Sequence, residues 1–548
     1  NIKEAIFSLK HNKAPGPDGI PAEFYQQFYE TIKGDLLQMF WDLSKGDLPL
    51  FSLNFRVITL IPNVQEAKVI QQYRPICLLN VSYKIFTKVA TNWLTLVADK
   101  VVSPTQTAFI KSQNILEGVV VLFETIHELI EKTKRGNLLD FDKKAYDKVQ
   151  WPFLFKHSKW ISWIETFISS GTVAVNINDD VRHYFQTKKE DSTRISITSL
   201  VQYYADQNWR GSLRQSSPHL VDGGLSILQN ADDIILFMYH DPNKAHNMKL
   251  LLFAFEQALG LKINFHKSEL FCFGDAQDKV ELYIELFGCK ARNFPINYLG
   301  IPIHFRKLRN CDWVQVEERF EKRLNSWKGK HLPIGGRLTL INSVLSSLPM
   351  YMMSFFSIPK GVLKKLDYFR LRFFWQGDEN KKKYKLAKLS ILCQPKDQGG
   401  LGILDLSTKN SALLCKWMYK LLTSDGMWQQ IHRNKYIGSK PLDQVEWKIG
   451  DSHFWSCPMK VKLDFLCFGT FLVKEGSQVR FWEDIWLDGA QLKEQYPSLY
   501  NIARPKSITI VEAMSSSPPS IYSRRQLYGT NLDNWYFLLS CLEGLELS

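Results

Sequence analysis

Two adjacent aspartates, Asp232 and Asp233, stand between two short apolar segments of the chain. The segments 225–229 and 234–238 are rich in Ile and Leu, and a polar point between such segments is typical of a β-hairpin with the acids at its tip. Neighbouring carboxylates repel each other unless a cation lies between them. Hard oxygen ligands of this kind suit Mg²⁺, and two such ions about 3.5–4 Å apart can stabilise both oxygens of an in-line phosphoryl displacement. The pair therefore indicates nucleotidyl transfer if a third carboxylate joins it, and an ordinary surface turn if none does.

The elements around this hairpin can be read from apolar periodicity and from turn residues. A loop at 12–21 holds three prolines and two glycines, which exclude a helix there. The pattern predicts a strand and six helices. The helix expected at 313–330 has a stripe of large apolar residues that we expect to face a core. The strand is expected at 56–62, and the helices at 22–41, 81–99, 111–134, 313–330, 338–353 and 363–375.

Composition narrows the class of protein. With 548 residues, 45% of them hydrophobic, the chain is long enough for two to four domains with a sizeable core. Its net charge of +14 favours a polyanionic partner such as nucleic acid. Nine cysteines without CxxC pairs signal neither a zinc module nor a disulfide framework. We expect an intracellular protein, nuclear or cytoplasmic and not secreted, without a membrane span. Because the chain begins without Met, we also expect a fragment of a longer reading frame.

The third carboxylate lies in the segment Leu-Asp-Phe-Asp-Lys-Lys-Ala-Tyr-Asp at 139–147. Together with Ala-Asp-Asp at 231–233, it resembles the reverse transcriptases of non-LTR (LINE-type) retrotransposons, particularly the plant type, and the resemblance covers nearly the whole chain. The Trp-rich tail resembles the thumb and connecting segment of the plant elements. Further motifs match in order, namely Asn-Lys-Ala-Pro-Gly-Pro-Asp-Gly at 12–19, Ile-Thr-Leu-Ile-Pro at 58–62, Tyr-Arg-Pro-Ile at 73–76, Gly-Leu-Lys-Ile-Asn at 260–264 with Lys-Ser at 267–268, and Tyr-Leu-Gly-Ile-Pro at 298–302.

The resemblance implies an α+β right-hand polymerase with fingers, an antiparallel palm sheet, and a mostly helical thumb and C-terminal extension. The implied domains are an N-terminal extension with fingers at 1–125, a palm at 126–305, a thumb at 306–400 and a Trp-rich connection at 401–548. The implied partners are an RNA template, a DNA primer and deoxynucleoside triphosphates, and the oligomeric state stays open.

The resemblance also implies roles for single residues. Asp140, Asp232 and Asp233 would hold two Mg²⁺ ions. Arg74 would meet the nucleotide's phosphates, Tyr146 would select the sugar, and Lys267 would lie near the leaving pyrophosphate. Without the family resemblance, the alternative interpretations are a surface salt bridge for Arg74, core packing for Tyr146 and an ordinary loop residue for Lys267.

Three departures from the family pattern bear on activity. The turn that seats template and nucleotide is missing, and an unrelated stretch within 186–218 replaces it, which damages the centre of the palm. The distance from Asp140 to the Ala-Tyr pair is one residue too long, so Asp142 is the alternative ligand. Asn230 stands where an aromatic residue is usual, and a buried amide there needs a new partner.

These observations predict an RNA-directed DNA polymerase of a LINE-type element that works by two-metal nucleotidyl transfer, in a copy that has lost its activity. The alternative is a non-catalytic relic that still binds nucleic acid. A third reading is a translated relic without a stable fold. A group II intron maturase is a more distant relative that the Trp-rich tail disfavours.

Overall fold

A computed structural model describes most of the chain as two compact units, Asn1–Ile296 and Asn297–Ser548. Helices and sheets are mixed, as the sequence predicts. For residues 135–144 the description covers the backbone alone. The described residues are 1–50, 53–64, 66–101, 105–107, 114–133, 135–144, 171–177, 180–181, 183–186, 225, 227–230, 233–238, 240–259, 262–263, 265, 268–327, 332–375, 386–438, 440, 442–469, 479–487, 489–515 and 526–542.

The first unit opens with two short helices, α1 (Ile2–Phe7) and α2 (Ala22–Gln27), and a longer one, α3 (Tyr29–Lys45). The single helix predicted over 22–41 is wrong, because Phe28 interrupts it with φ −99° and ψ 17°. The Gln26 amide donates to the carbonyls of Ile6 (3.0 Å) and Leu9 (3.1 Å) and so ties α2 to α1. This tertiary contact outweighs the continuity of the helix, and it leaves Phe28 45% exposed.

The proline-rich loop at 12–21 is anchored by Asn80. The Asn80 carboxamide accepts a bond from the Asp18 N–H (3.2 Å) and donates to the Leu53 carbonyl (3.1 Å). A Cβ on Gly16 would lie 2.3 Å from Asn80 Oδ1, so only glycine permits this approach. The loop is thereby fixed to the junction where the second strand meets its following helix.

A five-stranded sheet in order β2-β1-β4-β5, with β6 on β4, follows these helices. The predicted strand at 56–62 is confirmed as β1, which pairs antiparallel with β2 and parallel with β4. The predicted helix at 81–99 is confirmed as α4. The bounds are β1 (Phe55–Pro62), β2 (Tyr73–Leu79), α4 (Val81–Val101), β4 (Thr172–Ile177), β5 (Asp180–Val181) and β6 (Phe185–Gln186), with a 3-10 turn η2 at Ile70–Gln72.

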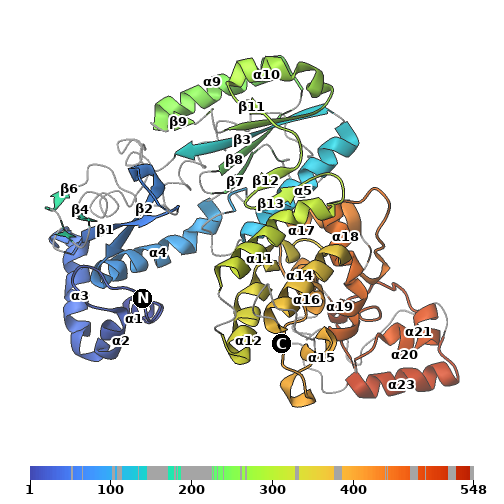
Figure 1. Cartoon of the computed structure of the whole chain (residues 1–548). Helices are drawn as coiled ribbons and strands as arrows, with labels where there is room; N and C mark the ends of the chain where they lie inside the picture. Colours follow the sequence, from blue (N-terminus) through green and yellow to red (C-terminus); the bar gives the residue numbers. More distant parts are fainter. Residues whose placement is uncertain are drawn as a thin grey trace. The chain divides into compact units, whose positions relative to one another are not determined.

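The second sheet runs in the order β11-β10-β3-β8-β7, with β9 on β3. Figure 1 shows α5 beside β7, against which it packs. The helix predicted over 111–134 corresponds to α5, which a π-helical turn at Leu129–Thr133 extends. The bounds are α5 (Ile115–Glu128), β3 (Arg135–Lys144), β7 (Ile227–Asn230), β8 (Asp233–Met238), α9 (Pro242–Leu259), β9 (Lys262–Ile263), β10 (Glu269–Gly274), η5 (Asp275–Lys279), α10 (Val280–Phe287) and β11 (Lys290–Ala291).

The second unit is mainly helical. The helix predicted over 313–330 corresponds to α11, which ends at Ser326. Of the predicted stripe, Val316 and Phe320 on α11 and Trp313 in the preceding 3-10 turn are at most 2% exposed, while Leu324 and Trp327 are half-buried. The helix predicted over 338–353 is wrong: α12 ends at Ser343 and α13 starts only at Met350. Serine hydroxyls bond back to backbone carbonyls here, as Ser343 does to Thr339 (2.7 Å), and such bonds compete with helix continuation before Pro349.

The helix predicted over 363–375 is confirmed as α14. The remaining elements of this unit are, with their bounds, β12 (Ile296–Tyr298), β13 (Ile301–Ile303), η6 (Asn310–Trp313), α11 (Val314–Ser326), α12 (Ile334–Ser343), η8 (Leu345–Ser347), α13 (Met350–Met353), α14 (Lys360–Trp375), α15 (Leu389–Leu392), η9 (Lys396–Gln398), α16 (Leu406–Thr423), α17 (Met427–His432), η10 (Arg433–Ile437), η11 (Leu442–Gln444), α18 (His453–Lys460), α19 (Lys462–Phe468), α20 (Leu492–Gln495), α21 (Pro497–Ile502), α22 (Ile510–Ala513) and α23 (Thr530–Leu542).

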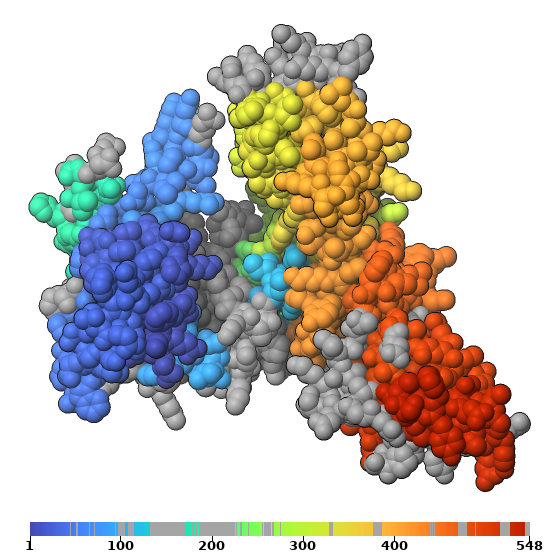
Figure 2. All heavy atoms as spheres, turned by 90° about the horizontal axis from the view of Figure 1, so that it is seen from below, coloured from blue at the N-terminus to red at the C-terminus, as the bar shows by residue number. Residues whose placement is uncertain are grey.

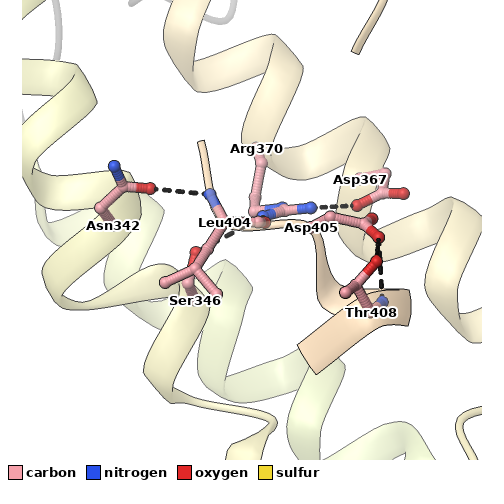
Figure 3. Close-up of polar contacts among 7 residues, drawn as sticks. All are labelled: Asn342, Ser346, Asp367, Arg370, Leu404, Asp405 and Thr408. Carbon is pink, nitrogen blue, oxygen red and sulfur yellow. Dashed lines mark hydrogen bonds and ion pairs between the residues drawn. The ribbon is translucent and has the colours of Figure 1, made fainter. Parts of the chain in front are cut away.

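A buried arginine joins two helices of this unit. Arg370 on α14 is 1% exposed and donates to the Leu404 carbonyl (2.6 Å), the Ser346 hydroxyl (3.4 Å) and the Asp367 carboxylate. Figure 3 shows Arg370 reaching both Asp367 and the segment around Leu404 that leads to α16, where Asp405 caps the helix by accepting from the Thr408 N–H (2.9 Å). Arg370 therefore links α14 to the start of α16.

An aromatic core lies among α13, α16, α17 and α18. Trp417 and Phe454 stand edge to face at 5.3 Å, and His453 stacks on Phe356 with ring centroids 5.2 Å apart and planes 15° apart. Burial, helped by the positive charges of Lys460 and Lys307, lowers the pKa of His453 from 6.5 to about 4. The neutral imidazole is thus part of the folded core.

We expect the second unit to lose stability as the pH falls from about 6.5 to about 4. The unfolded chain protonates His453 near 6.5 but the folded chain only near 4, so in this window the unfolded state binds more protons. The loss should reach about 3 kcal/mol at pH 4 and level off within about one pH unit below it. Urea unfolding of the chain and of His453→Phe, which keeps the ring stack but cannot titrate, measures this. An equal pH slope in both would contradict the expectation.

A separate apolar cluster holds the C-terminal part of the second unit together, drawn in red in Figure 2. Its buried carboxylate, Glu483, accepts from the Tyr500 hydroxyl (2.8 Å), the Gln444 amide (3.0 Å) and Arg480 (3.1 Å). The core of the cluster comprises Phe481, Trp482, Leu492, Leu499, Ala503, Ile508, Ile510, Ala513, Leu538 and Leu542.

Two negative expectations concern membranes and thiols. Among the described helices, none is long and apolar enough to cross a bilayer. All nine cysteines fall in the described residues and all are free, so no disulfide framework is present.

Candidate functional site

The predicted hairpin is present as β7 and β8, which pair antiparallel from Ile227↔Leu236 to Asn230↔Asp233. Asn230 and Asp233 form its last pair, so Ala231 and Asp232 are the two connecting residues, and these lie outside the described residues. Asp233 is half-buried at the start of β8, while the rest of β8 is buried. A two-residue connection of this kind sets the register of both strands.

The neighbouring strand, β3, carries both candidate third carboxylates. Its register with β8 puts Asp142 opposite Asp233 and Asp140 opposite Ile235. On its other side, Asp140 is opposite Glu269 of β10, whose carboxylate pairs with Arg292 at 3.1 Å. Asp142 is therefore at the level of the last hairpin pair, and Asp140 is two residues farther along the strand.

Asn230 has the new partner that the sequence requires. Its side-chain amide, in a residue only 7% exposed, donates to the Thr107 hydroxyl at 3.0 Å. Thr107 lies in a short segment beside β7 and was not among the residues that the sequence singled out. No local pattern could have identified it, because 123 residues separate it from Asn230.

The other predicted site residues are less completely described. Arg74 lies on β2 opposite Ile61, and its side chain is exposed. Tyr146 and Lys267 lie outside the described residues. Within the part of the chain whose side chains are described, no group of three or more His, Cys, Asp or Glu could hold a metal. That search leaves out Asp232 and the side chains of Asp140 and Asp142.

The donor set at the hairpin nevertheless fits a hard cation. The backbone positions of Asp142 and Asp233 lie opposite each other at the end of two adjacent strands, and Asp232 precedes Asp233 in the sequence. Carboxylate oxygens are the ligands that Mg²⁺ prefers, and Mg²⁺ usually takes one or two of them together with substrate phosphates. Carboxylates at these positions would suit divalent ions that also bind a phosphorylated substrate.

Comparison with known proteins agrees with this chemistry. Residues 61–303 match the family described as "Reverse transcriptase (RNA-dependent DNA polymerase)". The chain is 32% identical over 218 residues to "Putative ribonuclease H protein At1g65750" of Arabidopsis thaliana, an overlap of 39% of this chain and 34% of that protein. It is 25% identical over 443 residues to "Transposon TX1 uncharacterized 149 kDa protein" of Xenopus laevis, an overlap of 77% and 33%.

A third relative is short. "Uncharacterized mitochondrial protein AtMg00310" of Arabidopsis thaliana is 28% identical over 144 residues, which is 26% of this chain and 93% of that protein. The chain spans about a third of the length of the first two relatives.

Proposed function

Because the chain belongs to the reverse transcriptases of non-LTR retrotransposons, we propose that it is the polymerase region of such an element. The reaction of the ancestral element is RNA-templated DNA synthesis. In this proposal the sheet of β3, β7, β8 and β10 is the palm and the sheet of β1, β2 and β4 belongs to the fingers. The second unit supplies the thumb and the C-terminal connection.

The observation that carries the proposal is the pairing of Asp142 with Asp233 across β3 and β8. Directly opposite positions of an antiparallel pair are the closest across two strands, so this register supports Asp142, rather than Asp140, as the ligand beside Asp232 and Asp233. When bound there, two Mg²⁺ ions would neutralise charge on the transferring phosphate and lower the pKa of the primer 3′-hydroxyl.

Three further side chains are proposed to bind the incoming nucleotide. Arg74 is exposed on β2, and its guanidinium fork suits phosphate oxygens. Tyr146 would crowd a 2′-hydroxyl, and Lys267 would lie near the leaving pyrophosphate. These roles rest on the family resemblance.

The copy described by this sequence is proposed to be slow or inactive. The turn that seats template and nucleotide is missing from the sequence, and a misplacement of about 1 Å between reactants can cost about 100-fold in rate. The net charge of +14, which favours nucleic-acid binding, is a property of the whole chain and not of that turn. Nucleic-acid binding is therefore expected to outlast catalysis, and the second candidate function is a binding protein without polymerase activity.

Primer extension on an RNA template with Mg²⁺ tests the first candidate, beside Asp233→Ala as a control. Slow extension that the control abolishes is expected if the carboxylate site works. Extension that survives in the control would come from a contaminant and would contradict the site. Absent extension with RNA still bound, its log K falling linearly with log salt, would favour the binding function.

A further inference from the structure

A short segment, residues 105–107, covers the outer edge of β7. Gln106 forms a parallel bridge with Gln229. The Gln229 N–H donates to the Thr105 carbonyl at 3.0 Å, and the Thr107 N–H donates to the Gln229 carbonyl at 2.9 Å. The segment thus extends the sheet at the hairpin, in the last residues before the tip.

The Thr107 hydroxyl bonds to two consecutive residues of β7. It donates to the Gln229 carbonyl at 3.1 Å and accepts from the Asn230 amide at 3.0 Å. One hydroxyl can do both, since it has one proton and two lone pairs. Thr107 is 5% exposed and Asn230 is 7% exposed, so water cannot readily replace either bond. An amide left unpaired at such a site is costly.

Helix α5 fixes the position of Thr107. A Cβ on Gly118 would lie 2.6 Å from Thr107 Cγ2 and 2.7 Å from Thr107 Oγ1. Thr107 therefore occupies the space that a side chain at position 118 would fill. Residues around Gly118 on α5 are buried, including Val119, Val120 and Leu122. Thr107 thus packs against a buried part of α5.

We propose that Thr107 is the positioning residue of the hairpin tip. Its hydroxyl holds Asn230, and Asn230 pairs with Asp233, so a shift of Asn230 displaces Asp233. In this chain a hydrogen bond takes over the fixing of position 230 from the aromatic ring that is usual there. The consequence for metal binding rests on the proposed function, whereas the fixing of the hairpin does not.

Two measurements on the full chain test the proposal. In Thr107→Val, which keeps the shape of the side chain but loses the hydroxyl, amide hydrogen exchange at residues 225–240 should quicken about tenfold. Binding of Mn²⁺, followed by its EPR signal, should weaken about tenfold, as it does when a supporting partner of a ligand is lost. Thr107→Ser keeps the hydroxyl and should restore both values to within about twofold of the unsubstituted chain.

Thr125→Val is the matched control. Thr125 lies on the same helix as Gly118 and is 2% exposed, and its hydroxyl donates to the Val121 carbonyl at 2.8 Å. This variant loses a buried threonine hydroxyl that bonds within α5 itself, so neither exchange at 225–240 nor Mn²⁺ binding should change. Gly118→Ala should behave as Thr107→Val does, because the added methyl displaces Thr107.

The outcomes separate the two proposals. Unchanged exchange at 225–240 in Thr107→Val overturns the fixing of the hairpin by Thr107. Faster exchange with full Mn²⁺ affinity overturns its consequence for metal binding. Faster exchange throughout the first unit, in Thr107→Val and Thr125→Val alike, would reduce Thr107 to a general packing residue. A failure of the unsubstituted chain to bind Mn²⁺ contradicts the proposed metal-dependent function, and the metal-free exchange data then decide the positioning role.

Discussion

Asp142→Asn is expected to abolish Mg²⁺-dependent primer extension, while Asp140→Asn keeps most of it. Asp142 is opposite Asp233 at the end of the hairpin. Asp140 lies two residues, about 7 Å, farther along β3. Loss of a supporting partner costs about 10–100-fold in metal affinity, and loss of a ligand should cost more. Asparagine keeps the size of the side chain and removes the charge, so the comparison isolates the carboxylate.

Binding of Mn²⁺ in the presence of primer–template and a nucleotide measures this directly, and it does so even if extension is too slow to detect. Asp233→Ala serves as the positive control for a lost ligand. Asp140 is the matched comparison because it is the same residue type on the same strand, and its cross-strand partner Glu269 pairs with Arg292 at 3.1 Å. The reverse result, with weak binding in Asp140→Asn alone, would mean that Asp140 is the ligand and that Asp142 is the extra residue of this segment.

The sequence leaves this choice open for a physical reason. Residues i and i+2 of a strand lie on the same face, so alternation cannot separate Asp140 from Asp142. Their distance from the hairpin depends on strand register, which is set by contacts between β3 and β8 and not by either strand alone. The hairpin itself was predictable, because apolar segments flank a polar pair and both strands are local in sequence.

Two of the long periodic segments were predicted well, a tertiary contact accounts for the error at 22–41, and local serine hydrogen bonds account for the error at 338–353. Strand β1 and helix α14 follow their patterns closely. The break at Phe28 arises because Gln26 bonds to the carbonyls of Ile6 and Leu9, 20 and 17 residues away. The hydrogen-bond partner of Asn230 could not be predicted either, because Thr107 belongs to no periodic pattern and contacts Asn230 only in the folded sheet.

Arg370→Met is expected to destabilise the second unit by about 3–5 kcal/mol. Its guanidinium is buried and bonds to the Leu404 carbonyl, the Ser346 hydroxyl and the Asp367 carboxylate. Burial already raises the pKa of Asp367, against the lowering effect of Arg370. Removal of the arginine leaves a largely buried carboxylate without this cation, and breaking a buried pair in this way costs about 3–5 kcal/mol. Lysine should not rescue it, because one ammonium cannot reproduce the planar fork.

The matched control is Arg433→Met in the same unit. Arg433 pairs with Asp425, and the two side chains are 41% and 70% exposed, so its loss should cost less than about 1 kcal/mol. Hydrogen exchange of peptides from α14 and α16 in urea reports this unit separately from the first. An equal, small effect of both substitutions would mean that Arg370 does not join α14 to α16. A difference of several kcal/mol requires a cooperative fold, because only then does one buried contact change the stability of both helices together. Such a difference would therefore also exclude the reading of this chain as a relic without a stable fold.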